Sequence, residues 1–92
     1  MFFVYIVRTN ENTLYTGQTN NLEKRIKEHK SKSARSAKYL LRFESVELVY
    51  VQKCESRKEA MQRELEIKNW PKVKKEALIR SEGLVGVVSP SM

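Results

Sequence analysis

The chain has 92 residues, which is enough for one small domain and too few for two. Its 40% hydrophobic and 32% charged residues exclude a disordered chain, and no apolar run approaches the length of a membrane span. The net charge of +7 favours a polyanionic partner, nucleic acid ahead of an anionic membrane surface, although a merely solvated basic surface would give the same charge.

The start of the chain and its single cysteine both favour a cytoplasmic protein. The apolar run at residues 2–7 has no basic segment before it and meets Arg8 at once, so we expect a buried strand rather than a signal peptide. Such a continuous run is typical of a strand covered on both faces. Cys54 cannot form an internal disulfide and has no neighbours with metal-ligand spacing, which favours a reducing compartment.

Turn-forming residues 10–12 separate this run from a second predicted strand, residues 13–18, so a hairpin is expected. A turn centred near Asn10 and Glu11 would place Tyr5 and Tyr15 roughly opposite each other, with Cβ atoms about 5 Å apart. Gly17 removes a side chain from the second strand at a point where another group can approach the backbone.

A helix is predicted directly after the second strand. Asn20 is a good N-cap, and Glu23 three places on completes a capping box. Arg25 and His29 are four residues apart, so they lie on one face of this helix, one turn from each other.

The rest of the chain predicts a third strand and further helices. Residues 30–37 form a basic loop or a frayed helix, 37–43 a helical turn and 46–51 a strand. Ser56 and Glu59 make a capping box for a helix to about Trp70, and Pro71 suits the start of another helix to about Arg80. This order indicates one α+β domain over residues 1–82, with a partly disordered tail at 83–92.

One acidic residue lies on the apolar side of the predicted helix that follows Ser56. Four apolar residues share that side with it: Ala60, Met61, Leu65 and Ile67. Removing an unpaired carboxylate from water costs several kcal/mol, so Glu64 needs a cation. That cation is either a structural partner, such as Arg25 or a lysine, or a bound metal ion, and helical geometry alone favours the salt bridge.

Five segments, in order and at the right spacing, together resemble the GIY-YIG nuclease domain, and most closely its small single-domain bacterial branch. The segments are FFVYIV, LYTGQTNNLEKRIKEH, AKYL, ELVY and AMQRELEIKNWPKVKKEAL. The resemblance extends from Phe2 to about Ile79. It implies a small antiparallel sheet of about three strands flanked by helices, one divalent ion (Mg²⁺ or Mn²⁺) and cleavage of phosphodiester bonds, with DNA as the partner.

The resemblance also assigns roles to individual residues. Four residues are candidates for catalysis: Tyr5, Tyr15, Arg25 and His29. Arg25 would stabilise charge that develops on the phosphoryl oxygens, and Glu64 would bind the metal. Either Tyr15 or His29 would orient or deprotonate the attacking water. A tyrosine has a pKa near 10, so as a base it would need help from a cation.

Candidate nucleic-acid contacts comprise one glycine of the second predicted strand and five basic residues between 30 and 42. They are Gly17, Lys30, Lys32, Arg35, Lys38 and Arg42. The alternative for the basic residues is a solvated loop, whereas phosphate contacts predict an affinity that falls steeply with salt.

Three functions remain open at this point. The first is a metal-dependent DNA endonuclease acting in repair or processing. Three departures from the family pattern favour a second, a nucleic-acid-binding module with little or no catalysis: no Gly-Ile precedes Tyr5, Gln18 stands where some members have lysine, and no asparagine follows Asn69. The third is an interaction domain that dimerises through its apolar tail. The two tyrosines would then be ordinary sheet aromatics.

Overall fold

The computed structural model describes residues 1–31 and 38–83, so most of the predicted basic loop and nearly all of the predicted tail lie outside the described residues. The elements are β1 (Phe2–Thr9), β2 (Leu14–Thr19), α1 (Leu22–Ser31), α2 (Lys38–Leu41), β3 (Val46–Cys54), α3 (Arg57–Lys68) and α4 (Lys72–Glu82). Their order is the predicted one. Over these ranges, no helix is long and apolar enough to cross a membrane.

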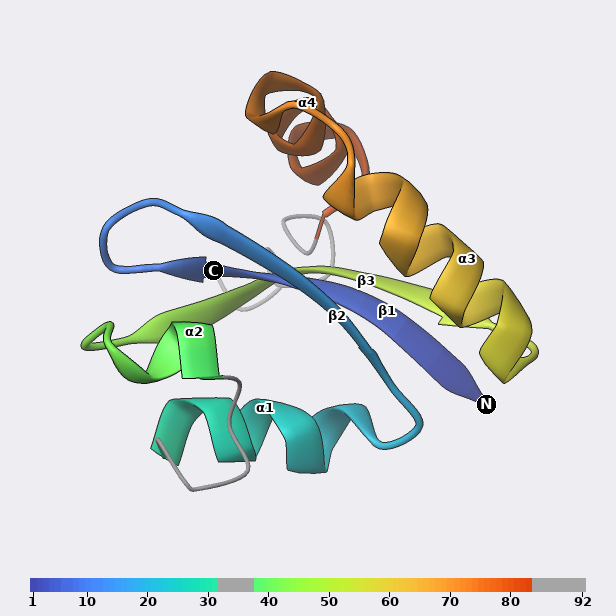
Figure 1. The fold of residues 1–92 in the computed structure, drawn as a ribbon, viewed down its shortest axis with the longest axis horizontal. Helices are drawn as coiled ribbons and strands as arrows, with labels where there is room; N and C mark the ends of the chain where they lie inside the picture. The colour runs from blue at the N-terminus through green and yellow to red at the C-terminus, as the bar shows by residue number, and fades with distance from the viewer. Residues whose placement is uncertain (32–37, 84–92) are drawn as a thin grey trace, which may run out of the picture.

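The three strands form one antiparallel sheet in the order β2-β1-β3. Helices α1 and α2 lie on one side of it, and α3 and α4 lie on the other (Figure 1). The predicted α+β class, with a small three-stranded antiparallel sheet flanked by helices, is therefore confirmed. Strand β1 is central and covered on both faces, as its apolar run predicts, whereas β2 is an edge strand.

Successive side chains of β1 point to opposite faces of the sheet, so the molecule has two small cores. The first core is Val4, Ile6, Tyr50, Cys54, Ala60, Ile67 and Ile79, under α3 and α4. The second is Tyr5, Val7, Leu40 and Phe43, completed by residues of α1 that include Leu22 and Ile26. Because both cores use β1, the sheet holds α1 and α3 in fixed positions on opposite sides of it.

Helix α3 begins as predicted, but fewer of its apolar residues are buried against the sheet than predicted. The Ser56 hydroxyl accepts a hydrogen bond from the Glu59 N–H at 3.1 Å, which confirms the cap. Met61 and Leu65 are 48% and 63% exposed, so their predicted place in the core is wrong. The buried members, Ala60 and Ile67, lie on a single row, and Glu64 is the third residue of that row.

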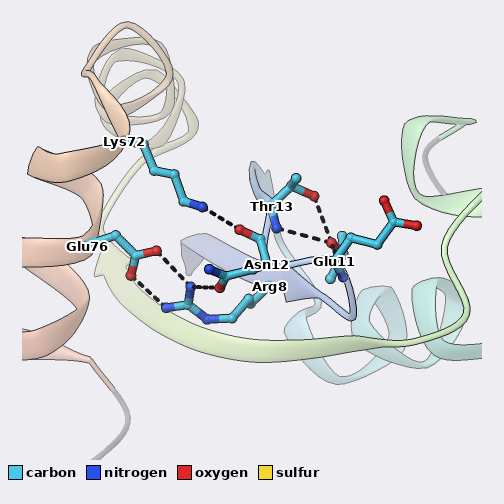
Figure 2. A network of polar contacts seen from close by, with 7 residues as sticks. Arg8, Glu11, Asn12, Thr13, Lys72 and Glu76 are labelled. Carbon is cyan, nitrogen blue, oxygen red and sulfur yellow. Dashed lines mark hydrogen bonds and ion pairs between the residues drawn. The ribbon is translucent and has the colours of Figure 1, made fainter.

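The turn of the β1–β2 hairpin is tied to α4 by a charged network (Figure 2). Arg8 donates to both carboxylate oxygens of Glu76 at 2.7 Å and to Oδ1 of Asn12 at 2.7 Å. Lys72 donates to the backbone oxygen of Asn12, which has a positive φ of 65°. Asparagine tolerates that left-handed conformation better than most residues. A bidentate guanidinium–carboxylate pair is the strongest form of such a contact, so it fixes where α4 lies.

We predict that Glu76→Gln lowers the free energy of unfolding by about 1 kcal/mol at pH 7. The hydrogen bond from Arg8 holds the pKa of Glu76 below its ordinary value of 4.5. This contribution is therefore complete above pH 4.5 in the wild type and is lost as the pH falls through the lowered pKa. Urea unfolding at pH 7 and pH 2 measures it, with the exposed Glu82→Gln as the control. A difference between Glu76→Gln and wild type that is unchanged at pH 2 would contradict the assignment.

Candidate active site at the edge of the sheet

Tyr5 reaches the edge of the sheet because its partner on β2 has no side chain. The register pairs Tyr5 with Gly17, and residues directly opposite each other project to the same face. A Cβ on Gly17 would lie 2.5 Å from the Tyr5 hydroxyl oxygen and 2.7 Å from the ring carbon that bears it, which is closer than such atoms approach. The outer end of the Tyr5 ring therefore lies over β2, and a residue of the central strand places its hydroxyl on the edge strand.

Helix α1 presents Arg25 and His29 to that hydroxyl. The cap is Asn21, whose Oδ1 accepts a hydrogen bond from the Lys24 N–H at 3.1 Å. The predicted capping box of Asn20 with Glu23 is therefore wrong by one residue, because the chain turns into the helix after Asn20, which stays exposed. Arg25 and His29 share one face of α1 wherever the helix begins, and both form hydrogen bonds with the Tyr5 hydroxyl.

A hydrogen-bonded chain runs from Arg25 through Tyr5 to His29. Nε2 of His29 lies 2.9 Å from the Tyr5 hydroxyl oxygen, and the Arg25 guanidinium donates to the same oxygen. Since a guanidinium can only donate, the Tyr5 oxygen is the acceptor from Arg25, and the Tyr5 hydroxyl donates its proton to Nε2 in the tautomer of His29 that is protonated on Nδ1. Burial, opposed by Arg25, raises the pKa of Tyr5 to about 12, so Tyr5 keeps its proton at neutral pH.

His29 is neutral at physiological pH. The side chain is only 2% exposed, and burial, followed by the charge of Arg25, lowers the pKa of His29 to about 4. An unprotonated imidazole can accept a proton, and the Tyr5 hydroxyl is the hydrogen-bond partner of Nε2.

Tyr15 lies on the same face as Tyr5 but not opposite to it. The hairpin register pairs Tyr15 with Val7, because the turn is centred on Glu11. The predicted Tyr5–Tyr15 pairing is therefore wrong, and the partner of Tyr15 lies two residues further along β1. The two rings are joined instead by His29, whose centroid lies 5.8 Å from Tyr5 and 5.9 Å from Tyr15, edge-on to the latter. Tyr15 is only partly buried, so part of its surface reaches solvent.

Arg25 is held in place by a carboxylate that the sequence analysis did not single out. A guanidinium nitrogen of Arg25 lies 3.0 Å from a carboxylate oxygen of Glu28, with the two side chains 27% and 16% exposed. The spacing of three residues in a helix was the available signal for this pair. Tyr5 and Glu28 together fix the guanidinium while part of it remains open to solvent.

Glu64 comes to the site from the opposite side of the sheet, around the edge strand. Burial is the main cause of the raised pKa of Tyr5, and Tyr15 and then the negative charge of Glu64 add smaller increases, which in the case of Glu64 is a longer-range effect than a contact. Of the cations left open for Glu64, a lysine is its partner: Nζ of Lys68 lies 2.9 Å from Oε2 of Glu64. A partly exposed pair at this helical spacing contributes about 0.3–0.5 kcal/mol, so it leaves the carboxylate available to a stronger cation.

The donors at this edge fit one magnesium-like ion. In the described ranges no three His, Cys, Asp or Glu side chains come together, which does not fit a structural zinc site. Mg²⁺ keeps several waters and takes one or two carboxylates, with substrate phosphates completing its shell. Glu64, with a side chain that is 20% exposed, would hold such an ion through one carboxylate.

A sequence model described as the GIY-YIG catalytic domain matches residues 1–77. The chain belongs to the GIY-YIG family. A UPF0213 protein of Desulfotalea psychrophila is 41% identical to this GIY-YIG chain over 92 residues, which cover 98% of this chain and 83% of the relative. A UPF0213 protein of Natronomonas pharaonis is 42% identical over 80 residues, covering 87% of this chain and 92% of the relative.

A solved structure shows the same fold. It is the solution NMR structure of a UPF0213 protein from Bacillus halodurans, which is 36% identical with a TM-score of 0.59 and covers 90% of this chain and 87% of its own. The GIY-YIG domain is a nuclease domain that generally uses a divalent metal. Phosphodiester hydrolysis is therefore the reaction to consider for the residues at the edge of β2.

The basic residues predicted to contact nucleic acid are only partly described for this GIY-YIG chain. Lys30 is exposed at the end of α1, beside an open hollow of about 730 Å³. Three lysines and two glutamates line this hollow, together with Asn21 and Ser31: Lys24, Lys27, Lys30, Glu23 and Glu28. Arg42 is exposed, with its guanidinium 5.2 Å from the centre of the Phe43 ring. Lys32 and Arg35 lie outside the described residues, and Lys38 begins α2 with its side chain undescribed.

We predict that Gly17→Ala destabilises the protein by about 1–3 kcal/mol, because the added methyl collides with the Tyr5 ring. The same substitution in a Tyr5→Val background should cost much less, since the colliding ring is gone. A double-mutant cycle from urea unfolding measures the coupling. Additive effects of the two substitutions would mean that Tyr5 does not lie over Gly17.

We predict that buried, neutral His29 makes the protein less stable in acid. The ordinary pKa of histidine is 6.5 and burial lowers that of His29 to about 4, so the unfolded chain takes up the proton first. Stability is full above pH 6.5 and falls by about 3 kcal/mol by pH 4 through this group alone. Unfolding curves of wild type and His29→Gln between pH 7 and pH 4.5 measure the effect. Equal slopes for both proteins would contradict it.

Proposed function

We propose that this protein is a divalent-metal-dependent DNA endonuclease, acting in DNA repair or processing in a reducing cytoplasm. The observation that carries the proposal is a guanidinium and a carboxylate near the tyrosines of β1 and β2. Arg25 of α1 donates to the Tyr5 hydroxyl. On α3, Lys68 pairs with Glu64 and lies 6.0 Å from the centre of the Tyr15 ring. The net charge of +7 and the cations along α1 support a polyanionic substrate.

Arg25 is the group that stabilises the transition state. Negative charge develops on the phosphoryl oxygens as the phosphodiester bond is hydrolysed, and a guanidinium already oriented by Tyr5 and Glu28 need not reorganise to meet it. Removing such a preorganised group costs about 3 kcal/mol or more in comparable sites. The planar guanidinium has the geometry to bind two oxygens of a phosphate group at once.

Glu64 is the protein ligand of the metal ion. When bound, the ion would neutralise charge on the scissile phosphate and on the leaving oxygen. Glu64 fits this task because its carboxylate is partly exposed and its partner Lys68 is only weakly held.

The proton of the attacking water passes to the Tyr5–His29 pair. Tyr5 takes the proton from water on its hydroxyl oxygen as its own proton moves to Nε2 of neutral His29, so the hydroxyl is regenerated and the imidazole becomes charged. Tyr15, the other candidate, supports the His29 ring from its edge and faces solvent. His29 shares a hydrogen bond with the Tyr5 hydroxyl, whereas Tyr15 contacts only the imidazole ring, which favours His29 as the final acceptor.

A nucleic-acid-binding module is the second candidate. The observation in its favour is that, in the part of the chain the structure describes, Glu64 belongs to no group of three His, Cys, Asp or Glu side chains and carries an ion pair to Lys68. A module of this kind would bind DNA with a steep salt dependence and without nicking it.

We predict that the protein nicks plasmid or branched DNA in the presence of Mg²⁺, and that Glu64→Gln and Arg25→Gln each reduce the rate by about 100-fold or more. Glu66→Gln and Arg57→Gln, which alter partly or fully exposed charges on α3, are the matched controls and should retain activity.

The cleavage assay also separates the two candidates. Cleavage that persists in both site variants would place the chemistry elsewhere. Salt-sensitive binding without any nicking by the wild type would favour the binding module.

A further inference from the structure

Lys68 is a charged group beside Glu64 to which neither the family resemblance nor the proposed mechanism assigns a role in the reaction. It lies one turn after Glu64 on α3, and its Nζ is 2.9 Å from Oε2 of Glu64. The same Nζ is 6.0 Å from the centre of the Tyr15 ring, so the ammonium is close to both Glu64 and Tyr15. Its side chain is 46% exposed, so it can change partner without disturbing the core.

The ammonium and a metal ion compete for the same carboxylate. Oε2 of Glu64 accepts a hydrogen bond from Lys68, and a divalent cation held by the same carboxylate would repel the neighbouring ammonium. Lysine has a flexible four-carbon stem, so its ammonium can move away while staying near Tyr15.

We propose that Lys68 is an exchangeable cation of the active site, which neutralises Glu64 before the metal binds and then binds a non-bridging oxygen of the substrate phosphate. The inference rests on the proposed function, because it needs Glu64 to be the metal ligand. It assigns two successive partners to one ammonium. With Arg25 on the α1 side, the phosphate would be held by cations from both faces of the sheet.

The first test measures metal affinity directly and needs no cleavage. Mn²⁺ is titrated into wild type, Lys68→Met and Lys58→Met, with free Mn²⁺ followed by electron paramagnetic resonance. Lys58 is an exposed lysine of the same helix, ten residues earlier and about 15 Å along its axis. Removing the competing charge at Lys68 should tighten Mn²⁺ binding about three- to tenfold, whereas Lys58→Met should leave it within about twofold.

The second test reads the phosphate contact. In the presence of Mg²⁺, Lys68→Met should reduce the slope of log K for DNA binding against log salt concentration by about one. It should also lower kcat/KM, and Lys68→Arg should restore both quantities. Unchanged Mn²⁺ affinity in Lys68→Met would overturn the exchange, and an unchanged salt dependence would overturn the phosphate contact.

Glu64→Gln separates a failure of the proposed metal site from a failure of the proposed role of Lys68. If Glu64→Gln abolishes Mn²⁺ binding and Lys68→Met does not change it, the proposed metal site stands and only the role of Lys68 fails. If wild type binds no Mn²⁺, or binds it as well as Glu64→Gln does, both the metal site and the role of Lys68 fail.

Discussion

The candidate site depends on the close packing of the Tyr5 ring over Gly17. Tyr5 belongs to the central strand, where its side chain would ordinarily be enclosed by both neighbouring strands and α1. The missing side chain on β2 lets the hydroxyl extend to the edge strand, where Arg25 and His29 of α1 reach it. Lys68 of α3 lies near Tyr15 of the same edge strand, which places its ion pair with Glu64 close to this edge.

Burial then determines the protonation states on which the chemistry relies. The pKa of Tyr5 rises to about 12 and that of His29 falls to about 4 for the same reason, because each charged form would lose its hydration. The result is a neutral donor next to a neutral acceptor, flanked by a permanently charged guanidinium. A proton can cross such a pair without either group being charged in the resting state.

The sequence predicted the fold better than it predicted the details of the site. Hydrophobic runs and the Ser56 cap were enough for the strands and for α3, because each is a local signal. The partner of Glu64 was left open, because a helical row does not show whether a neighbouring lysine or a residue from another element lies closer. The Tyr5–Tyr15 pairing failed since register depends on where the turn is centred, and Asn20 with Asn21 offered two caps of equal quality. The Arg25–Glu28 contact was available from spacing alone.

Paramagnetic broadening by Mn²⁺ in NMR spectra of the full chain is the most direct test of a single site shared by both faces of the sheet. We predict that amide signals of Glu64, Gly17 and Arg25 broaden first, while Asn12, at the hairpin turn about 17 Å along β2 from Gly17, is unaffected. The broadening should disappear in Glu64→Gln. Broadening centred on another part of the chain, or unchanged in that variant, would contradict the account.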